Sequence, residues 1–295
     1  MSINGFGNKM VEKLREILGS LYIIEYKEVV KNNGKVYHAI LVKKESEKIA
    51  PTIYIDDDYK AFTEGVDIDT LVYRFVKIYK ENAVNGDFDV SSFTDFSKAC
   101  KHFTFKVVGY DKNRQQLRDI PYKKIHDLAL VPVCMIKSDS LGEGSITIKN
   151  DHMKYWEVSF DELWENVYEY AEENSPVSIE SILHTLGHMV PGNMCDSFLK
   201  DMLVISNESK LKGASAIFYP GVMERIADRF GGDFVIIPSS IHEVIALCLP
   251  TGVDISGLVS MVREVNSTVV SDEEVLSDSV YLYDHKAKEL KIYSE

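Results

Sequence analysis

The sequence predicts an α+β fold, with mixed, largely antiparallel sheets and packed helices arranged in two α+β halves. Asn33 and Gly34 separate two β-rich segments, which is the strongest short-range signal for a hairpin. Segments with helical periodicity alternate with short strand-like runs that follow one another closely, as in layered α+β sheets rather than doubly wound ones. With 295 residues, 45% of them hydrophobic, the chain can form a substantial core.

Residues 1–150 are expected to form the N-terminal half. Apolar residues recur at helical spacing from Val11 to Leu18, where Gly19 supplies a stop, and again from Leu71 to Tyr79. These two segments predict amphipathic helices. A short helix is expected near residues 93–100, and the expected strands cover residues 22–30, 36–42, 52–55, 103–108, 128–136 and 145–148.

The run of residues 127–136, DLALVPVCMI, is apolar on both faces, which predicts a central strand. Pro132 complicates this prediction, because proline lacks the N–H that a ladder hydrogen bond needs and is normally confined to edges or bulges.

Residues 151–200 are expected to be a helical connector, with helices over 160–170 and 179–189 and a break at residues 174–176. Residues 201–295 are expected to form the C-terminal half. Its predicted elements are strands over 202–206, 234–237 and 243–249, a turn at Gly213, helices over 221–230 and 255–265, and a hairpin of 280–283 with 290–293.

Charge and cysteine spacing exclude several classes of protein. The formal net charge is -13, which disfavours nucleic acid as a partner because phosphate contacts need clustered Lys and Arg. The four cysteines form no C-x-x-C pair, so reduced thiols are expected rather than a zinc knuckle or a disulfide scaffold. No run approaches the apolar length of a membrane span, and charges interrupt the apolar residues at the N-terminus, so we expect a cytoplasmic protein without membrane contact.

Six segments together resemble an uncharacterised bacterial family of domains of unknown function, over nearly the whole chain. They are PTIYID (51–56), IHDLALV (125–131), LVISN (203–207), GASAIFYPGVMERIA (213–227), IIPSSIHEVIAL (236–247) and MVREVNSTVVSDEEVLSDSVYLYD (261–284). The resemblance implies a cytoplasmic bacterial protein, often from accessory or mobile parts of genomes. It implies no activity that can be named.

The strongest candidate for chemistry is the segment with Ser239, Ser240, His242 and Glu243. One serine as nucleophile with His242 as its base would follow the logic of acyl transfer. In a strand over 240–247, however, side chains alternate, so Ser240 and His242 share a face while Glu243 points away. No G-x-S-x-G elbow is present. A turn whose hydroxyls bond the backbone, or a helix start with Ser240 and Glu243 as a capping box, explains the same residues without catalysis.

His184 and His188 are the candidate metal ligands, because positions four apart on a helix lie on one face. Thr185 stands where the zincin pattern needs Glu, and a third ligand such as His152, Asp196 or His242 cannot be placed from sequence. No metal or other cofactor is therefore assigned. Phosphate-binding glycine motifs are absent as well.

Asn207 and Asn266 each stand at the end of an expected element, where Asn commonly bonds the backbone. A sharper hypothesis places them in one cleft with Ser239, Ser240 and His242.

The sequence leaves two candidate functions. The first is a non-catalytic protein that binds an unknown protein partner or small ligand. The alternative is a hydrolase-like enzyme that uses His242 with Ser239 or Ser240, or a metal at His184 and His188.

Overall fold

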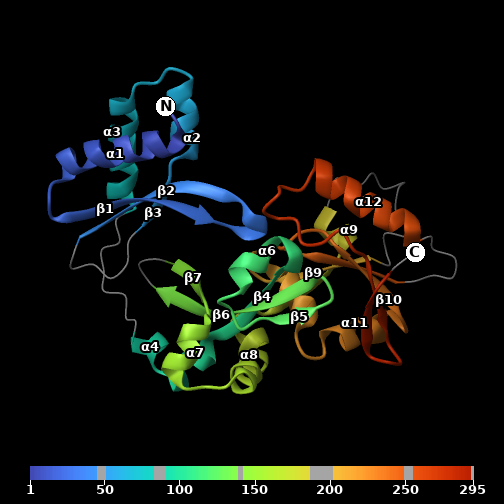
Figure 1. The fold of residues 1–295 in the computed structure, drawn as a ribbon. Helices are drawn as coiled ribbons and strands as arrows, with labels where there is room; N and C mark the ends of the chain where they lie inside the picture. The colour runs from blue at the N-terminus through green and yellow to red at the C-terminus, as the bar shows by residue number, and fades with distance from the viewer. Residues whose placement is uncertain (45–50, 83–90, 139–141, 187–201, 249–254, 294–295) are drawn as a thin grey trace. The chain divides into compact units, whose positions relative to one another are not determined.

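The computed structural model of the chain describes residues 1–44, 51–82, 91–138, 142–186, 202–248 and 255–293 (Figure 1). The fold is α+β, as predicted, with open and mostly antiparallel sheets. The chain divides into two compact units. The first comprises Met1–Val90 and Lys137–Glu143, and the second comprises Ser91–Ile136 and Gly144–Glu295.

These units do not follow the boundaries expected after residues 150 and 200. Phe103, Trp164 and Leu203 belong to one hydrophobic core, although they were expected in the first half, the connector and the second half. Trp164 lies on helix α8 (Phe160–Asn174), which buries four side chains in that core. Helical periodicity identified this helix but could not show which elements cover its apolar face.

The first unit is a three-stranded antiparallel sheet with helices packed on it. Its strands are β1 (Tyr22–Val30), β2 (Val36–Lys44) and β3 (Thr52–Tyr54), in the order β1-β2-β3. Its helices are α1 (Ile3–Leu18), α2 (Asp56–Thr63) and α3 (Ile68–Glu81), and Figure 1 shows them gathered on one side of the sheet. Buried side chains of α1 and α3, such as Phe6 and Phe75, meet Ile24 and Ile40 of the sheet.

The predicted hairpin of the first unit is confirmed. Strand β1 pairs with β2 in register from Tyr22 opposite Lys44 to Val30 opposite Val36. Asn33 and Gly34 both have left-handed backbone conformations, with φ of 58° and 74°. Asn and Gly are the residues that adopt such conformations at the least cost, which is why this pair marked the turn in the sequence.

The second unit contains two sheets surrounded by helices. The four-stranded sheet has the order β4-β6-β5, with β7 also paired to β6, and the six-stranded sheet has the order β13-β12-β10-β11-β9-β8. The strands are β4 (Phe103–Gly109), β5 (Lys123–Ile125), β6 (Leu128–Ser138), β7 (Gly142–Thr147), β8 (Val177–Ser181), β9 (Met202–Asn207), β10 (Phe234–Pro238), β11 (Val244–Cys248), β12 (Tyr281–Asp284) and β13 (Glu289–Ile292).

Helices and single turns connect these strands. Besides α8 they are α4 (Ser91–Thr94), α5 (Phe96–Ala99), α6 (Tyr110–Leu117), α7 (Asn150–Trp156), α9 (Ile182–Leu186), α11 (Val222–Phe230), α12 (Ile255–Thr268) and the 3₁₀ segments η2 (Cys100–His102) and η4 (Gly213–Phe218). In the first unit, the 3₁₀ turn η1 (Asn32–Gly34) joins β1 to β2. The helices predicted over 221–230 and 255–265 correspond to α11 and α12.

Strand β6 is central in its sheet, as predicted, and the structure explains how it contains Pro132. Pro132 pairs with Phe105 of β4, while its carbonyl accepts a hydrogen bond from Ile148 N on the opposite side (2.9 Å). The nitrogen of a strand residue faces the same side as its carbonyl. The N–H that proline lacks would therefore point away from β4, at the place where pairing with β5 has ended, so the ladder to β4 is intact.

The helix predicted over 179–189 is wrong at its start. Residues 177–181 form β8, which pairs antiparallel with β9, and within the described part of the predicted range only α9 is helical. The residues of β9 are all buried and supply backbone groups for β8 to pair with. Such pairing overrides local periodicity, because strand formation depends on packing against a neighbour.

Among the described residues, no helix is long and apolar enough to cross a membrane.

The cap of α7 predicts a pH dependence of stability. His152 Nδ1 accepts a hydrogen bond from Lys149 N (3.2 Å), and its ring packs edge-on against Phe93. Burial lowers the pKa of His152 below its ordinary value. The unfolded chain therefore binds a proton more readily, so this contribution to stability is present above about pH 6.5 and is lost as the pH falls through the folded-state pKa.

Lowering the pH from 7.5 to 5 should reduce the free energy of unfolding of the wild type. We expect a smaller reduction in His152→Asn, because asparagine keeps an acceptor near the position of Nδ1. Urea denaturation at the two pH values measures this difference. His102→Asn, at an exposed position, is the control and should follow the wild type. Equal losses in all three proteins would contradict the prediction.

Candidate functional site

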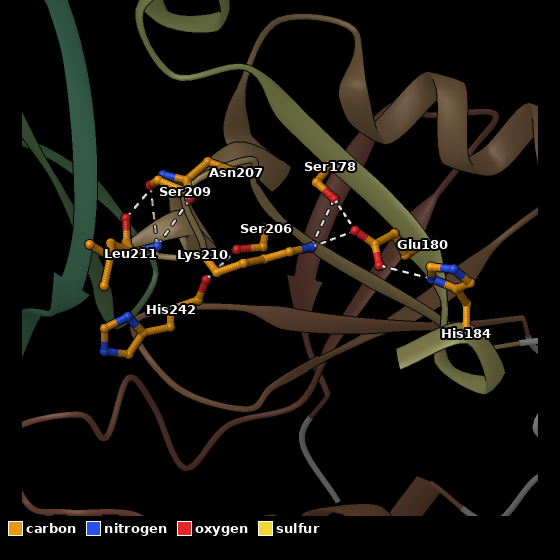
Figure 2. A network of polar contacts seen from close by, with 9 residues as sticks. All are labelled: Ser178, Glu180, His184, Ser206, Asn207, Ser209, Lys210, Leu211 and His242. Carbon is orange, nitrogen blue, oxygen red and sulfur yellow. Dashed lines mark hydrogen bonds and ion pairs between the residues drawn. The ribbon is translucent and has the colours of Figure 1, made fainter. Parts of the chain in front are cut away.

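A polar network in the second unit lies where β8 and β9 meet the loops that follow β9 and β10 (Figure 2). Its members come from three stretches of the sequence, residues 178–184, 206–211 and 242. They are Ser178 and Glu180 of β8, His184 of α9, Ser206 and Asn207 of β9, Ser209, Lys210 and Leu211 of the loop after β9, and His242 of the loop between β10 and β11.

Asn207, the last residue of β9, is buried and uses all of its hydrogen-bonding capacity. Its Oδ1 accepts from Leu211 N (3.2 Å) and from Ser209 Oγ (3.1 Å). Its Nδ2 donates to Leu211 O (2.9 Å) and to Ser175 Oγ (3.0 Å). An asparagine side chain offers two donor hydrogens and two acceptor lone pairs, so none is left over. This single side chain therefore binds both the backbone N–H and the backbone carbonyl of Leu211, in the loop that follows β9.

The loop of residues 208–212, which we name the Leu211 loop, has an unusual backbone. Lys210 and Lys212 both adopt left-handed conformations, with φ of 55° and 54°. A non-glycine residue in this region costs on the order of 1 kcal/mol or more and persists only where its surroundings hold it. Between these two lysines, Leu211 is 65% exposed. The loop is therefore rigidly supported and presents an apolar side chain to solvent.

Glu180 anchors the side chain of Lys210. Its carboxylate accepts from Lys210 Nζ (2.7 Å) and Ser178 Oγ (2.7 Å), and it lies 3.3 Å from His184 Nδ1. These contacts, with the Lys210 hydrogen bond as the largest cause, lower the pKa of Glu180 to about 2. Glu180 therefore stays ionised throughout the range in which most proteins are folded, so the tether to Lys210 persists there.

His242 connects the Leu211 loop to two other segments. Its Nδ1 accepts from Lys212 N (3.1 Å), its Nε2 lies 3.5 Å from Glu274 Oε1, and its carbonyl accepts from Ser206 Oγ (2.8 Å). A nitrogen that accepts a hydrogen bond carries no proton, so the ring is the tautomer with hydrogen on Nε2. Both ring nitrogens are thus engaged, one with the backbone and one with a carboxylate.

Strand β11 begins at Val244. The predicted strand over 243–249 therefore starts one residue too early, and the strand considered over 240–247 starts four residues too early. Ser239, Ser240, His242 and Glu243 lie in the loop before it, so strand alternation does not place Ser240 beside the imidazole. Instead, Ser240 Oγ accepts from His242 N (3.0 Å) and Ser240 N donates to Glu243 O (3.2 Å). The turn interpretation describes this loop, and no helix starts at Ser240.

The two candidate metal ligands cannot be compared as a pair. His184 is largely exposed on α9 and contacts Glu180, whereas His188 lies outside the described residues. Within the described part of the chain, no group of three or more His, Cys, Asp or Glu side chains is placed to hold a metal ion.

The hypothesis of one cleft stays a prediction. Asn207 and His242 both contact the Leu211 loop, and His242 N donates to Ser240 Oγ. Asn266 donates instead to Ser277 O (2.9 Å) and Asp278 Oδ1 (2.7 Å).

Beside the Asn266 contacts lies a second polar cluster, in which Asp127 accepts from Ser277 (2.6 Å), Ser279 (3.0 Å) and Tyr281 (2.7 Å). Burial raises the pKa of the Tyr281 hydroxyl. This cluster ties the hairpin of β5 and β6 to the segment before β12 and is a separate feature of the unit.

Sequence reasoning missed Glu180, Lys210, Leu211, Lys212 and Glu274. Two signals were present. Lys210-Leu211-Lys212 before Gly213 places an apolar residue between charges in a turn, and Glu274 belongs to a short acidic run at residues 272–274. Neither signal indicates that the Leu211 loop contacts His242, because His242 and Lys212 are separated by 30 residues.

Gly213 allows the close approach of the Leu211 loop to β9. A Cβ atom at this position would collide with Ser206 Oγ and the backbone nitrogen of Asn207, and would lie 2.8 Å from Asn207 Oδ1. A backbone nitrogen cannot swing aside as the end of a flexible side chain can. Gly213 is therefore required by space, since its φ is not in the left-handed region.

We expect Gly213→Ala to lower the free energy of unfolding by about 1–3 kcal/mol, the usual effect of overpacking. Gly232→Ala is the matched control, because a Cβ there meets no atom within 4 Å. Chemical denaturation measures both variants. If the two variants unfold at the same denaturant concentration, the claim that Gly213 packs closely against β9 is contradicted.

Comparison with known proteins assigns a family. No curated protein and no solved structure is significantly similar to the chain. A family model described as a family of unknown function (DUF5688) matches residues 3–285, which is nearly the whole chain. The sequence resemblance to an uncharacterised family is thereby confirmed. The chain belongs to this family of unknown function, DUF5688.

Proposed function

We propose that the chain is a non-catalytic protein-binding module and that the Leu211 loop is its contact element, with Leu211 as the anchor. The observation that carries this proposal is the contrast within the loop. The Leu211 side chain is 65% exposed, whereas its backbone N–H and carbonyl are both held by the buried Asn207. Isolated exposed leucines are common, but here a buried side chain holds the backbone of an exposed leucine outside any helix or strand.

Burial of the anchor would supply a useful part of the binding free energy. Fully burying a leucine side chain is favourable by roughly 1.5–3 kcal/mol. Ordering the backbone of one flexible residue opposes binding by about 1–2 kcal/mol, so a mobile loop of several residues would cancel the gain. Because the Leu211 loop is already held in the free protein, most of this entropic cost is absent on binding.

The backbone conformation of the loop supports the same proposal. Lys210 and Lys212 are held in left-handed conformations by Glu180, Ser178 and His242. Such strain concentrates at ligand-binding and functional sites, where the surrounding structure maintains it. A loop that served only to connect β9 to η4 could place glycine or asparagine at these positions and avoid the strain.

Catalysis by His242 with Ser239 or Ser240 is the alternative, and the geometry favours it less. His242 Nδ1 is engaged by Lys212 N, and Ser240 Oγ accepts from the His242 backbone rather than from its ring. A general base needs a free nitrogen within reach of the proton that it removes. A metal at His184 and His188 depends on a residue outside the described part of the chain.

We place this module in the cytoplasm. Among the described residues, the buried Cys100 and Cys134 are free thiols, as expected where the cell keeps thiols reduced. A net charge of -13 favours a protein partner over a nucleic acid, which a strongly acidic surface repels.

A photocrosslinking residue at position 211 tests the proposed contact. Incorporated in the full chain in cells, it should give discrete protein adducts. The same residue at Val269, which is 76% exposed on the same unit, is the control for exposure alone and should give none of these adducts. Asn207→Asp leaves the crosslinking residue at position 211 in place but removes both Nδ2 hydrogen bonds, so it should reduce the adducts at position 211 several-fold.

Adducts at position 211 that equal those at position 269, or that persist unchanged in Asn207→Asp, would contradict the proposal. Circular dichroism of each variant establishes that the fold is retained. A hydrolytic activity that His242→Ala abolishes would favour the enzyme instead.

A further inference from the structure

Strand β1 forms one edge of the three-stranded sheet in the first unit. It has nine residues, whereas β3 at the other edge has three. In an antiparallel pair, the backbone groups of alternate residues point toward the neighbouring strand, and those of the residues between them point away. An edge strand therefore offers one row of backbone groups with which another strand can pair.

Hydrogen bonds near the two ends of β1 show which residues form this outward row. Lys31 N donates to Lys35 O (2.7 Å) and continues the register of the ladder, so the odd-numbered residues face β2. The even-numbered residues face outward, which agrees with Ile24, because its carbonyl accepts from Arg15 of α1 (3.0 Å). Among the described residues, no partner bonds the outward backbone groups of Tyr26, Glu28 and Val30.

Tyr26, at the middle of β1, is held firmly by helix α1. Its hydroxyl donates to Asn4 Oδ1 (2.9 Å). Its ring lies against the buried Gly7, where a Cβ atom would collide with the ring. The centre of the edge is thus fixed in the free chain, so little conformational entropy is lost when another strand pairs with it.

The charges of β1 are complementary to those of a second copy that runs antiparallel about Tyr26. In this register Glu25 lies opposite Lys27 of the second copy, and symmetry makes the same pair occur twice. Both side chains are about half exposed, and they form an ion pair within their own strand (2.8 Å). Two copies would therefore bring together four charges of alternating sign, and opposite charges directly across two strands are stabilising.

The apolar residues of β1 meet one another in the same register. Near the two ends of the strand, Ile23 lies opposite Val29 and Tyr22 lies opposite Val30. Only Ile24 opposite Glu28 is an unmatched pair. Apolar pairs across two antiparallel strands contribute to sheet stability as the charge pairs do.

The neighbouring registers are disfavoured by charge. Moving the centre of symmetry by one residue still pairs the outward backbone groups with one another. It places Glu25 opposite its own copy in one direction, or Lys27 opposite its own copy in the other. Like charges directly opposite are destabilising, so the register about Tyr26 is selected over these two.

We propose that β1 is a self-association edge, through which two copies of the chain pair antiparallel about Tyr26 and join their sheets into one of six strands. A two-fold axis through Tyr26 makes the interface isologous. Arg15 leaves this pairing open, because a carbonyl oxygen has two lone pairs and Ile24 O can accept a second hydrogen bond. Charged side chains protect an edge from unrelated strands, and here the same charges match a copy.

Sedimentation velocity of the full chain over a range of micromolar concentrations measures this association. We expect the wild type to show a monomer–dimer equilibrium. Lys27→Glu creates two pairs of like charge in the interface and should weaken the dimer by roughly tenfold or more. Lys77→Glu, at an exposed position of α3, changes the net charge equally and should leave the association unchanged.

Two variants of opposite charge test whether the partner is a second copy. Glu25→Lys and Lys27→Glu should each associate weakly alone, because each places like charges opposite one another. Mixed together, they should form a dimer, since every positive side chain then meets a negative one. The double variant Glu25→Lys/Lys27→Glu should dimerise as the wild type does.

A wild type that stays monomeric over the whole concentration range would overturn the proposal. A dimer that Lys27→Glu leaves unchanged would do the same, because the interface would then lie elsewhere. Failure of the mixed variants to associate would show that the partner strand is not β1 of a second copy. Circular dichroism of each variant verifies that the fold is retained, as expected for substitutions at exposed positions.

Discussion

The side-chain amide of Asn207 is the interaction on which the site depends. Asn207 ends a strand whose residues are all buried, and it holds the loop that follows through both the N–H and the carbonyl of Leu211. The left-handed conformations of Lys210 and Lys212 flank this contact, and Lys212 in turn supplies the N–H for His242. Without the amide, the Leu211 loop would have no buried support at its centre.

The polar end of β9 is compatible with burial because its hydrogen bonds are complete. Ser206 is fully buried and donates to His242 O, and Asn207 uses all of its donors and acceptors. A satisfied hydrogen bond contributes only about 0.5–1.5 kcal/mol, whereas a buried group left unpaired costs roughly 1–3 kcal/mol. The network is therefore sensitive to loss of any one partner, which makes its geometry specific rather than merely stable.

How much could be predicted from the sequence depended on the range of the interactions. The hairpin of β1 and β2 followed from Asn33 and Gly34, and the central position of β6 followed from its continuous apolar run. Both signals lie within a few residues. Strand β8 was mistaken for helix because its conformation is set by pairing with β9, far along the chain.

The candidate site was predicted only in part for the same reason. Asn207 and His242 were selected, but as members of one cleft with Asn266, since the contact from Lys212 N to His242 Nδ1 has no local signature. The exposure of Leu211 could not be predicted either, because it follows from two left-handed lysines in a turn without periodicity. Side chains that hold a loop are visible in the sequence only as polar residues at the ends of elements.

The most direct test of this view is the hydrogen exchange rate of the Leu211 amide in the free protein, measured by NMR. Its side chain is exposed, yet its N–H donates to the buried Asn207 Oδ1 (3.2 Å). A supported loop predicts exchange far slower than the intrinsic rate for this sequence. Exchange at the intrinsic rate would show that the loop is mobile before any partner binds, which would contradict the central claim.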